Sequence, residues 1–431
     1  MKILMVNKYL YRKAGAEKYF FDLADLLRAN GHEVFMWGMD NKTADSCQLS
    51  AVSNTNNSIS YKLKAKSWNV SYFDFEHPET LRKKWRGFCR MLYSREAKKK
   101  FTQLVNEFKP DVVHIHNIYH QLSPSFLDVC RKKKIPVVMS VHDYSLICPN
   151  YKLFANGVID EGCKGNYFHD MFNGSVKGSL LGGFADAFAM FVHHTILRIY
   201  EKSISYYLCP SEFVQNKLIE FCIPKEKVVL LQYFLNENKN EVISTNYQLP
   251  TTNYILAYGR LSEEKGFEVL IRAMQKVPND VMLKIAGTGP DEERLKKITK
   301  ELQLESRVEF LGWQSGELFT QLRMHARCVV VPSVWHDPSP FVVLENLAEG
   351  VIVIGSRVGG ITEVLEKIDP ELLYDAADVQ ALTKKIKKVL DYTTAQRIEY
   401  SCRAQKMISE YYNPQDHYKK LLKLYNTLFH F

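Results

Sequence analysis

Two series of alternating strand-like and helix-like segments run along the chain. In the first series, short apolar runs typical of buried strands recur between amphipathic segments with helical spacing. These runs cover 2–6, 34–37, 111–115, 136–141, 206–209 and 228–231. The second series repeats the rhythm, with runs at 254–258, 281–286, 307–310, 328–331 and 351–354. Because strands that alternate with helices pair in parallel, each series predicts a doubly wound α/β sheet.

The two series predict two Rossmann-like domains that face a cleft. A polar stretch at 236–252 separates them and suits a linker, and the Asn- and Ser-rich stretch at 41–60 suits a loop. We therefore expect an N-terminal domain over 1–235, a C-terminal domain over 236–412 and a last helix over 413–431 that starts near Pro414.

The composition is that of a globular enzyme. Of 431 residues, 46% are hydrophobic and 24% are charged, which excludes a disordered chain and a disulfide-stapled mini-protein. The apolar run at 3–6 is too short for a secretory signal, and no stretch reaches the roughly 18 uninterrupted apolar residues of a spanning helix. The nine cysteines show no paired spacing, so we expect reduced thiols and a cytoplasmic protein.

Charge is distributed unevenly between the two predicted domains. Residues 1–235 hold 32 Lys and Arg against 22 Asp and Glu, a net charge of +10, whereas residues 236–431 hold 25 against 26, a net charge of −1. A basic N-terminal part suggests contact with an anionic surface or ligand. The alternative is drift in surface composition, which has no functional meaning.

A candidate phosphate site follows the strand expected at 254–258. Arg260 stands at the strand exit and Lys265 in the first turn of the next helix. Two cations at a helix N-terminus favour a diphosphate because fixed charge adds to exposed backbone N–H groups. The alternative is a pair of solvated surface cations beside Glu263 and Glu264.

A second candidate site follows the strand expected at 328–331. Pro340 suits the first turn of a helix, which would leave the N–H groups of Phe341 and Val342 facing an anion. Asp337 and Glu345, eight residues apart, could accept hydrogen bonds from sugar and ribose hydroxyls. The alternatives are a helix-capping acid for the former and a solvated helix acid for the latter.

Further motifs follow the other predicted strands. On the C-terminal side these motifs are Gly259-Arg260-Leu261-Ser262-x-x-Lys265-Gly266, Ala286-Gly287-Thr288-Gly289-Pro290, and Pro332-Ser333 with Glu345 and Gly359-Gly360-Ile361. On the N-terminal side they are Gly15-Ala16-Glu17, His114-Ile115-His116, and Val141-His142-Asp143-Tyr144 with Cys148-Pro149. In this order the motifs resemble family 4 of the retaining glycosyltransferases, which implies the GT-B architecture over essentially the whole chain. The ending Tyr412-Asn413-Pro414 is similar too, and implies a last helix that crosses back to the N-terminal domain.

The resemblance implies a role for each matching residue. Arg260 and Lys265 would hold the diphosphate of a nucleotide sugar, Glu345 the ribose hydroxyls, and Asp337 the donor sugar, although the family has Glu at that position. The remaining donor-binding residues would be Gly15, Trp313, Phe341 and Val342. His116 would touch the sugar, while His142 and Asp143 would lie near the acceptor. The residues expected to act in catalysis are Arg260, Lys265, Asp337, His116 and His142.

No metal or cofactor is expected for this reaction. Negative charge that develops on the leaving diphosphate would be stabilised by the two cations and by helix-terminal amides. We find no Asp-x-Asp motif, and Gly287-Thr288-Gly289 lacks the third glycine of a dinucleotide-binding loop. Relatives often carry more cysteines in the loop flanked by Cys148 and Cys163, where this chain has Asp160 and Ser175. A structural zinc needs about four ligands, so no zinc is predicted.

The acceptor side depends on residues 61–100. They contain twelve Lys and Arg against four Asp and Glu, interleaved with aromatic residues. This pattern suits an anionic membrane surface and a glycan or lipid-linked glycan acceptor, as in surface-polysaccharide synthesis; the alternative is a core helix with a solvated basic face. No nucleic-acid partner is expected. Two alternative functions remain open: a nucleotide-sugar-binding protein without catalysis, and an epimerase or phosphorylase of the same architecture.

Overall fold

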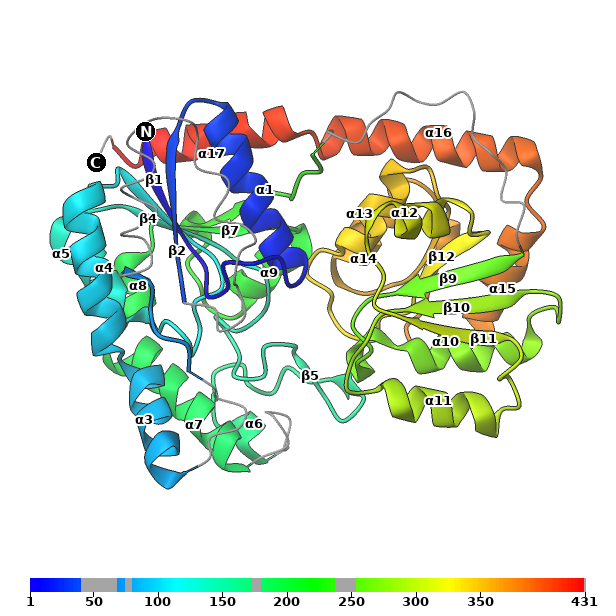
Figure 1. Ribbon diagram of the computed structural model, residues 1–431, viewed down its shortest axis with the longest axis horizontal. Coiled ribbons are helices and arrows are strands. Elements are labelled where there is room, and N and C mark those ends of the chain that lie inside the picture. The colour runs from blue at the N-terminus through cyan, green and yellow to red at the C-terminus, as the bar shows by residue number, and fades with distance from the viewer. Residues whose placement is uncertain (40–67, 74–79, 173–179, 237–252, 430–431) are drawn as a thin grey trace.

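Two parallel sheets form the two halves of the molecule. The computed structural model describes residues 1–39, 68–73, 80–172, 180–236 and 253–429, and we call the parts before and after the 237–252 gap the N-terminal and C-terminal halves (Figure 1). Within the described residues each half contains one six-stranded parallel sheet. The expected loop at 41–60 and most of the expected linker lie outside the described residues.

The first sheet has the strand order β2-β1-β3-β4-β7-β8. Its strands are β1 (Lys2–Val6), β2 (Glu33–Trp37), β3 (Val112–Ile115), β4 (Val137–Ser140), β7 (Tyr206–Cys209) and β8 (Val228–Leu230). Its helices are α1 (Gly15–Ala29), α3 (Leu81–Leu92), α4 (Arg95–Phe108), α5 (Leu127–Lys133), α6 (His169–Phe172), α7 (Leu180–Phe191), α8 (Ile199–Ser203) and α9 (Glu212–Glu220). β1 pairs on both sides, with β2 and with β3, and after Lys2 it is apolar, with its side chains buried on both faces of the sheet.

The second sheet has the strand order β11-β10-β9-β12-β13-β14. Its strands are β9 (Tyr254–Tyr258), β10 (Met282–Ala286), β11 (Val308–Gly312), β12 (Cys328–Val331), β13 (Val353–Ser356) and β14 (Leu373–Tyr374). Its helices are α10 (Phe267–Ala273), α11 (Glu292–Glu301), α12 (Gly316–Met324), α13 (Phe341–Ala348), α14 (Gly359–Leu365) and α15 (Val379–Leu390). Central β9 pairs with β10 and β12, so the segments that follow these neighbouring strands meet at one edge of the sheet.

Two final helices connect the halves. α16 (Thr394–Tyr411) packs on the C-terminal half, and α17 (Pro414–Thr427) crosses to the N-terminal half (Figure 1). Asn413 caps α17 by accepting hydrogen bonds from the backbone of Gln415 and Asp416, and Pro414 occupies the first helical position. The His417 ring then bonds to the Tyr19 hydroxyl of α1 at 3.0 Å. The predicted crossing-back helix and the GT-B-like pair of sheets are therefore confirmed.

Three local features differ from the expectations. α13 begins at Phe341, so Pro340 is its N-cap residue rather than a residue of its first turn. The antiparallel pair β5 (Phe154–Ala155) and β6 (Val158–Ile159) was not expected. Cys148 and Cys163 are joined in a disulfide, so the expectation of reduced thiols is wrong for this pair.

Among the helices of the described ranges, none combines the length and apolar character needed to cross a bilayer.

Candidate active site

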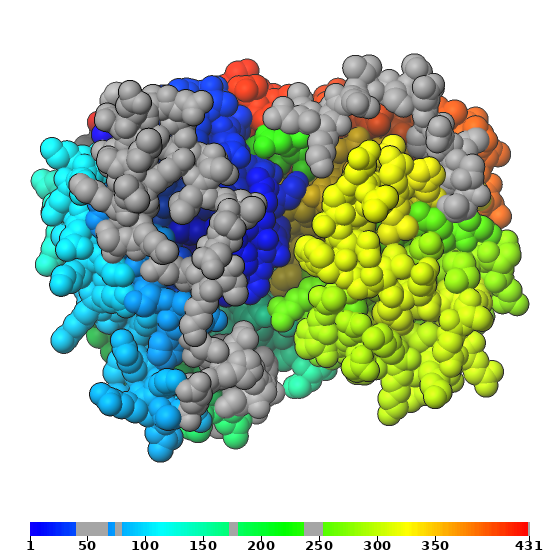
Figure 2. Space-filling model, in the orientation of Figure 1, coloured from blue at the N-terminus to red at the C-terminus, as the bar shows by residue number. Residues whose placement is uncertain are grey.

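The N-termini of two helices meet where the halves face each other. α1 begins at Gly15 and α13 at Phe341, and a Cβ atom on Gly15 would lie 3.0 Å from the Phe341 ring. The N–H groups of Val343 and Leu344 donate to the Pro340 carbonyl, whereas the first two N–H groups of an α-helix have no acceptor within it. The positive ends of two helices thus share one groove, which separates the blue and yellow parts of Figure 2.

Lys265 and Asp337 form an ion pair beside this groove. Lys265 Nζ lies 2.6 Å from Asp337 Oδ2, and its ammonium also lies over the Trp335 ring at 5.2 Å from the centroid. The Asp337 side chain is almost fully buried, whereas that of Lys265 is about one-third exposed. The structure therefore brings together two predicted site residues that are 72 positions apart in the sequence.

Both halves hold the loop that carries Asp337. The Tyr144 hydroxyl donates to the carbonyl of His336 at 2.9 Å, and the Ser211 hydroxyl donates to the carbonyl of Pro338 at 2.7 Å. These carbonyls flank Asp337 on either side. Two hydroxyl groups of the N-terminal half thus fix the backbone of a carboxylate that belongs to the C-terminal half.

Glycines of α14 allow its backbone to approach the same loop. A Cβ atom on Gly359, whose φ is +49°, would lie 2.4 Å from the Asp337 carbonyl oxygen. The neighbouring Gly360 N–H donates to that oxygen at 2.8 Å. Since a side chain at Gly359 would collide with backbone, glycine is needed there for steric reasons.

Glu345 lies in the second turn of α13 and is bound from both sides. Arg323 of α12 donates to its Oε2 at 3.2 Å, and Lys18 of α1 lies 3.0 Å from its Oε1. Arg323 is buried and also contacts Glu349 and the Tyr258 hydroxyl. The carboxylate is therefore oriented by its own half and paired with a cation of the opposite half.

Arg260 and Trp313 are more exposed than the residues around Asp337. Arg260 follows β9 and has no ion-pair partner among the described residues. Trp313 follows β11, the edge strand of the second sheet, and is 70% exposed. Arg260 lies at a strand exit as the sequence predicts, while the contacts of both residues with a donor stay a prediction.

The histidines predicted near the sugar form a hydrogen-bonded row. His116 Nδ1 bonds to His142 Nε2 at 2.8 Å, and His142 Nδ1 bonds to the Tyr233 hydroxyl at 2.5 Å. Burial lowers the pKa of His142 to about 3 and that of His116 well below its usual value. Tyr233 in turn stacks on Phe341 at 4.9 Å, so the row of neutral rings reaches the start of α13.

The position of His116 differs from the expectation that it touches a sugar. Its side chain has no exposed surface and lies behind His142, which is half-buried. His116 can therefore act on a ligand only through His142 in this conformation. Asp143 is also half-buried and accepts a hydrogen bond from the backbone of Ser145 at 2.9 Å.

Comparison with known families identifies the chain. Residues 14–237, just over half of the chain, match the family described as Glycosyltransferase Family 4. The chain belongs to glycosyltransferase family 4. Residues 239–407 match the family described as Glycosyl transferases group 1. The protein is therefore a retaining glycosyltransferase, and the family expected from its motifs is confirmed.

Individual relatives of this glycosyltransferase are more distant. A protein of Klebsiella pneumoniae described as an uncharacterized 42.6 kDa protein in the cps region is 29% identical over 321 residues, covering 72% of this chain and 76% of that protein. Sucrose-phosphate synthase from Thermosynechococcus elongatus superimposes with a TM-score of 0.71 at 18% identity, covering 99% of both chains. HepE from Anabaena in complex with UDP and glucose has a TM-score of 0.66 at 16% identity, covering 99% of this chain and 100% of that chain. These structures share the fold.

Sequence reasoning assigned no role to several residues of the glycosyltransferase's candidate site. Lys18, Tyr144 and Ser211 lie in the N-terminal half but contact Glu345 or the Asp337 loop, and Arg323 holds Glu345 within the C-terminal half. Their partners are more than twenty positions away in every case, so no local motif contains both members of a pair.

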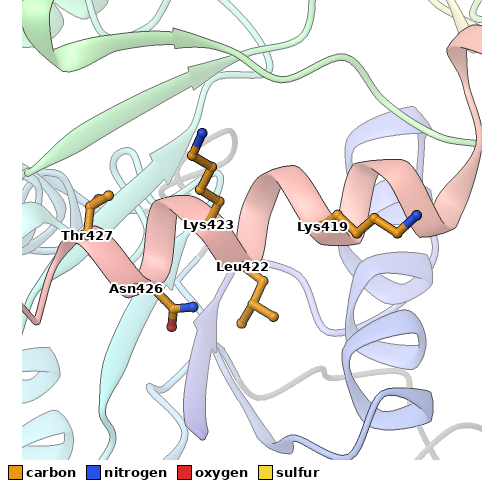
Figure 3. Close-up of a pocket in the computed structure, with 5 residues that line it drawn as sticks. All are labelled: Lys419, Leu422, Lys423, Asn426 and Thr427. Carbon is orange, nitrogen blue, oxygen red and sulfur yellow. The ribbon is translucent and has the colours of Figure 1, made fainter.

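Two further features of the glycosyltransferase lie apart from the predicted donor residues. A hollow of about 430 Å³ on α17 is lined by residues of that one helix, namely Lys419, Leu422, Lys423, Asn426 and Thr427 (Figure 3). Among the described residues, side chains close enough to share a metal ion gather around Cys148 and Asp170 rather than around Lys265. The metal-independent mechanism stays a prediction.

Proposed function

We propose that this glycosyltransferase moves a hexose from a uridine diphosphate sugar to a lipid-linked glycan at an anionic membrane surface, in the synthesis of a bacterial surface polysaccharide. The observation that carries the proposal is the convergence of two helix N-termini with Lys265, Asp337 and Glu345 in one groove. Two comparisons support the proposal. HepE was solved with UDP and glucose, which supports a uridine nucleotide, and the Klebsiella relative is described as lying in a cps region, which supports surface-polysaccharide synthesis.

The diphosphate would lie between the start of α1 and the start of α13. Gly15 has no side chain, so the backbone of α1 can approach a phosphate closely. The N-terminal amides of both helices and the cations of Arg260 and Lys265 would oppose the charge that grows on the leaving diphosphate. Fixed donors of this kind need no reorganisation during the reaction, so they favour the transition state over the bound substrate.

The two carboxylates would divide the recognition of the donor. Glu345, oriented by Arg323, would accept hydrogen bonds from the ribose hydroxyls after ribose displaces Lys18. Asp337, in a loop whose backbone is held by Tyr144 and Ser211, would accept hydrogen bonds from the sugar hydroxyls. Ribose is common to donor and product nucleotide, whereas the sugar is present only in the donor.

Surface features of α3 support a membrane-bound acceptor. Leu81 and Trp85 of this helix are 83% and 68% exposed. The cations of α3 are Arg82, Lys83, Lys84, Arg86 and Arg90, of which all but Arg90 are exposed. Neighbouring α7 exposes Leu180, Leu181 and Phe184 beside them. Apolar side chains next to cations fit the interface of an anionic bilayer.

Other aromatic residues of the 61–100 segment have structural roles. Trp68 is buried, and its carbonyl accepts a hydrogen bond from the Trp37 indole at 2.8 Å. The Tyr93 hydroxyl donates to Asp128 at 2.5 Å. The proposed surface therefore consists of the exposed side of α3 with the start of α7, while residues 61–67 and 74–79 lie outside the described residues.

The function is tested by screening donors and then products. Purified protein is mixed with a panel of nucleoside diphosphate sugars, and binding is measured by calorimetry. Mass spectrometry then follows addition of one hexose to a lipid-linked oligosaccharide. The proposal is supported if a uridine diphosphate sugar binds and its sugar is transferred. If nucleotide sugars bind but none in the panel is either transferred or hydrolysed, the protein is a nucleotide-sugar-binding protein without catalysis.

Vesicle sedimentation tests the membrane part. The wild type should bind vesicles rich in phosphatidylglycerol at low salt, release as salt rises, and ignore neutral vesicles, because exposed charges are screened beyond about 10 Å at roughly 0.1 M ionic strength. Reversing Lys83, Lys84 and Arg86 to Glu should release it, since each cation contributes about 1 kcal/mol. The control is a charge-matched reversal of lysines on α15, at Lys384, Lys385 and Lys387. Equal loss in both triple variants would show that net charge, not α3, governs binding.

A further inference from the structure

The loop between β4 and α7 reaches from the N-terminal half towards the donor side. Lys152 of this loop pairs with Glu264 at 2.9 Å, directly before Lys265 in the chain. Glu161 of the loop lies 3.2 Å from His336, directly before Asp337. The described part of this loop, residues 141–172, has little regular structure beyond β5, β6 and α6, so other interactions must keep it in shape.

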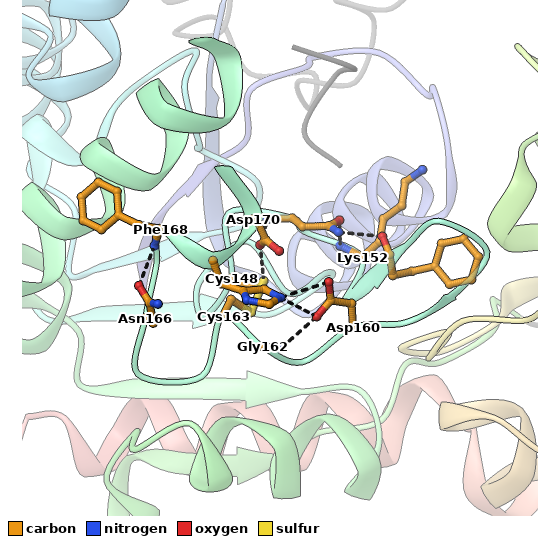
Figure 4. Close-up of a disulfide and its surroundings, with 11 residues drawn as sticks. Cys148, Lys152, Asp160, Gly162, Cys163, Asn166, Phe168 and Asp170 are labelled. Carbon is orange, nitrogen blue, oxygen red and sulfur yellow. Dashed lines mark hydrogen bonds and ion pairs between the residues drawn. A yellow bond between two sulfur atoms is a disulfide. The ribbon is translucent and has the colours of Figure 1, made fainter. Parts of the chain in front are cut away.

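A cluster of metal-ligating side chains lies at the base of this loop. The disulfide of Cys148 and Cys163 is buried, and Asp170 Oδ2 lies 3.1 Å from the Cys148 sulfur (Figure 4). The ligand atoms of these three residues all lie within 4.8 Å of one another. Asp160, His169 and Asp170 form a second group within the same limit, so Asp170 belongs to both.

The chemistry around the sulfurs exceeds what a disulfide requires. The buried Asp170 carboxylate accepts the backbone N–H of Asn150 at 3.1 Å, and the same oxygen lies against the Cys148 sulfur, which has no proton to donate in a disulfide. The His169 ring lies over Gly162, where a Cβ atom would come within 2.2 Å of its Nε2, and this nitrogen bonds to Asp160 at 3.0 Å. The two sulfurs and the Asp170 carboxylate are three ligands of the kind that tetrahedral zinc takes, and the His169 imidazole belongs to the second group, which shares Asp170.

We propose that this disulfide is the oxidised form of a zinc site. Two equivalents of a small cellular thiol reduce the Cys148–Cys163 bond and leave as their own disulfide, which yields two protein thiols. Both thiols lose their protons when Zn²⁺ binds, so two protons are released for each ion. Asp170 is the third ligand, and the hydrogen-bonded pair of Asp160 and His169 supplies the fourth.

The bound ion would stabilise the loop in a reducing compartment. Disulfides do not persist where thiol reductants dominate, whereas a thiolate zinc site does. The ion neutralises charges that would otherwise repel one another around Asp170. Lys152 and Glu161 would then stay paired with Glu264 and His336, so the zinc site would support the contact between the halves. The inference does not depend on which donor or acceptor the enzyme uses.

Metal and thiol analysis of the full chain tests the proposal. The protein is purified with a thiol reductant and zinc sulfate, freed of unbound metal, and its zinc content is measured by plasma mass spectrometry. We expect about one zinc ion per chain. The zinc content should fall about tenfold or more in Cys163→Ser and in Asp170→Asn, because each variant loses one ligand. Cys402→Ser, at an exposed cysteine of α16, is the matched control and should keep its zinc.

Two readouts on the wild type avoid dependence on variants that fail to fold. Cobalt(II) in place of zinc should give the intense thiolate-to-metal absorption of a two-sulfur site. Thiol titration after unfolding should count all nine cysteines in the zinc-loaded protein, and seven after mild oxidation with hydrogen peroxide, which releases the metal. Seven thiols without metal after purification under reductant would show a permanent disulfide and overturn the proposal. Nine thiols with no zinc retained would overturn it as well.

Discussion

Removing Lys265 should cost folding stability as well as rate, whereas removing Arg260 should cost rate alone. Lys265 Nζ lies 2.6 Å from Asp337 Oδ2, and the Asp337 side chain is only 7% exposed. At this distance and an effective dielectric constant of about 20, the gross attraction is about 6 kcal/mol. Desolvation of both groups offsets most of it, so Lys265→Ala should lower the free energy of unfolding by about 2–3 kcal/mol. Arg260→Ala should change it by less than about 0.5 kcal/mol.

The effect on rate should be similar for both residues. Each substitution removes one positive charge that acts on the leaving diphosphate, and loss of one such fixed donor costs about 10²–10³ in turnover. Neutralising the Asp337 carboxylate as well does not bring back the positive charge of Lys265. The double variant Lys265→Ala with Asp337→Asn should therefore regain most of the lost stability, because no unpaired carboxylate is left, and be at least as slow as the Lys265→Ala variant.

Urea unfolding and initial rates of nucleotide release measure the two effects on the same preparations. Lys276→Ala removes an exposed lysine of the same half and should change neither quantity. The reasoning is refuted if Lys265→Ala keeps wild-type stability, or if the double variant is no more stable than the single one. Near-normal turnover in both Arg260→Ala and Lys265→Ala would remove these cations from the mechanism.

Two further predictions concern recognition and pH. Glu345→Gln should weaken binding of free UDP by about tenfold, since a hydrogen bond to a charged acceptor is lost, whereas Asp337→Asn should leave UDP binding unchanged and impair transfer. Calorimetry measures the affinity of both variants for UDP, and equal effects would contradict the assignment of Glu345 to the ribose and Asp337 to the sugar. Burial lowers the pKa of His114 and His142 to about 3, so the unfolded chain binds more protons below pH 6.5. The free energy of unfolding should thus reach its full value above about pH 6.5 and fall by about 2 kcal/mol for each of these histidines between pH 7 and 5. If urea unfolding gives the same free energy over that range, the two rings are not buried in their neutral form.

The strands and the order of elements follow from local pattern. The apolar runs at 2–6, 206–209, 254–258 and 328–331 coincide with β1, β7, β9 and β12, because strands buried on both faces must be apolar throughout. β14 has only two residues, Leu373 and Tyr374, which is too short to form a recognisable run. Pro340 differs by one position because the first turn and the N-cap both tolerate a residue without an N–H group.

The candidate site was predicted only where one short segment contains its residues. Asp337 and Glu345 stand eight positions apart, so the loop and the start of α13 reveal both. Lys18 and Glu345 are paired through the folding of two separate sheets onto each other, and no spacing in the sequence encodes that contact. The same holds for the side chains around Cys148, since Asp170 lies against its sulfur from 22 positions further along the chain.

The anomeric configuration of the product tests the central claim most directly. An α-linked uridine diphosphate hexose is supplied with an acceptor, and the anomeric proton of the new linkage is read by nuclear magnetic resonance. A retaining transfer, assisted by the cations and helix termini around Lys265, gives an α-linked product. A β-linked product would contradict the account.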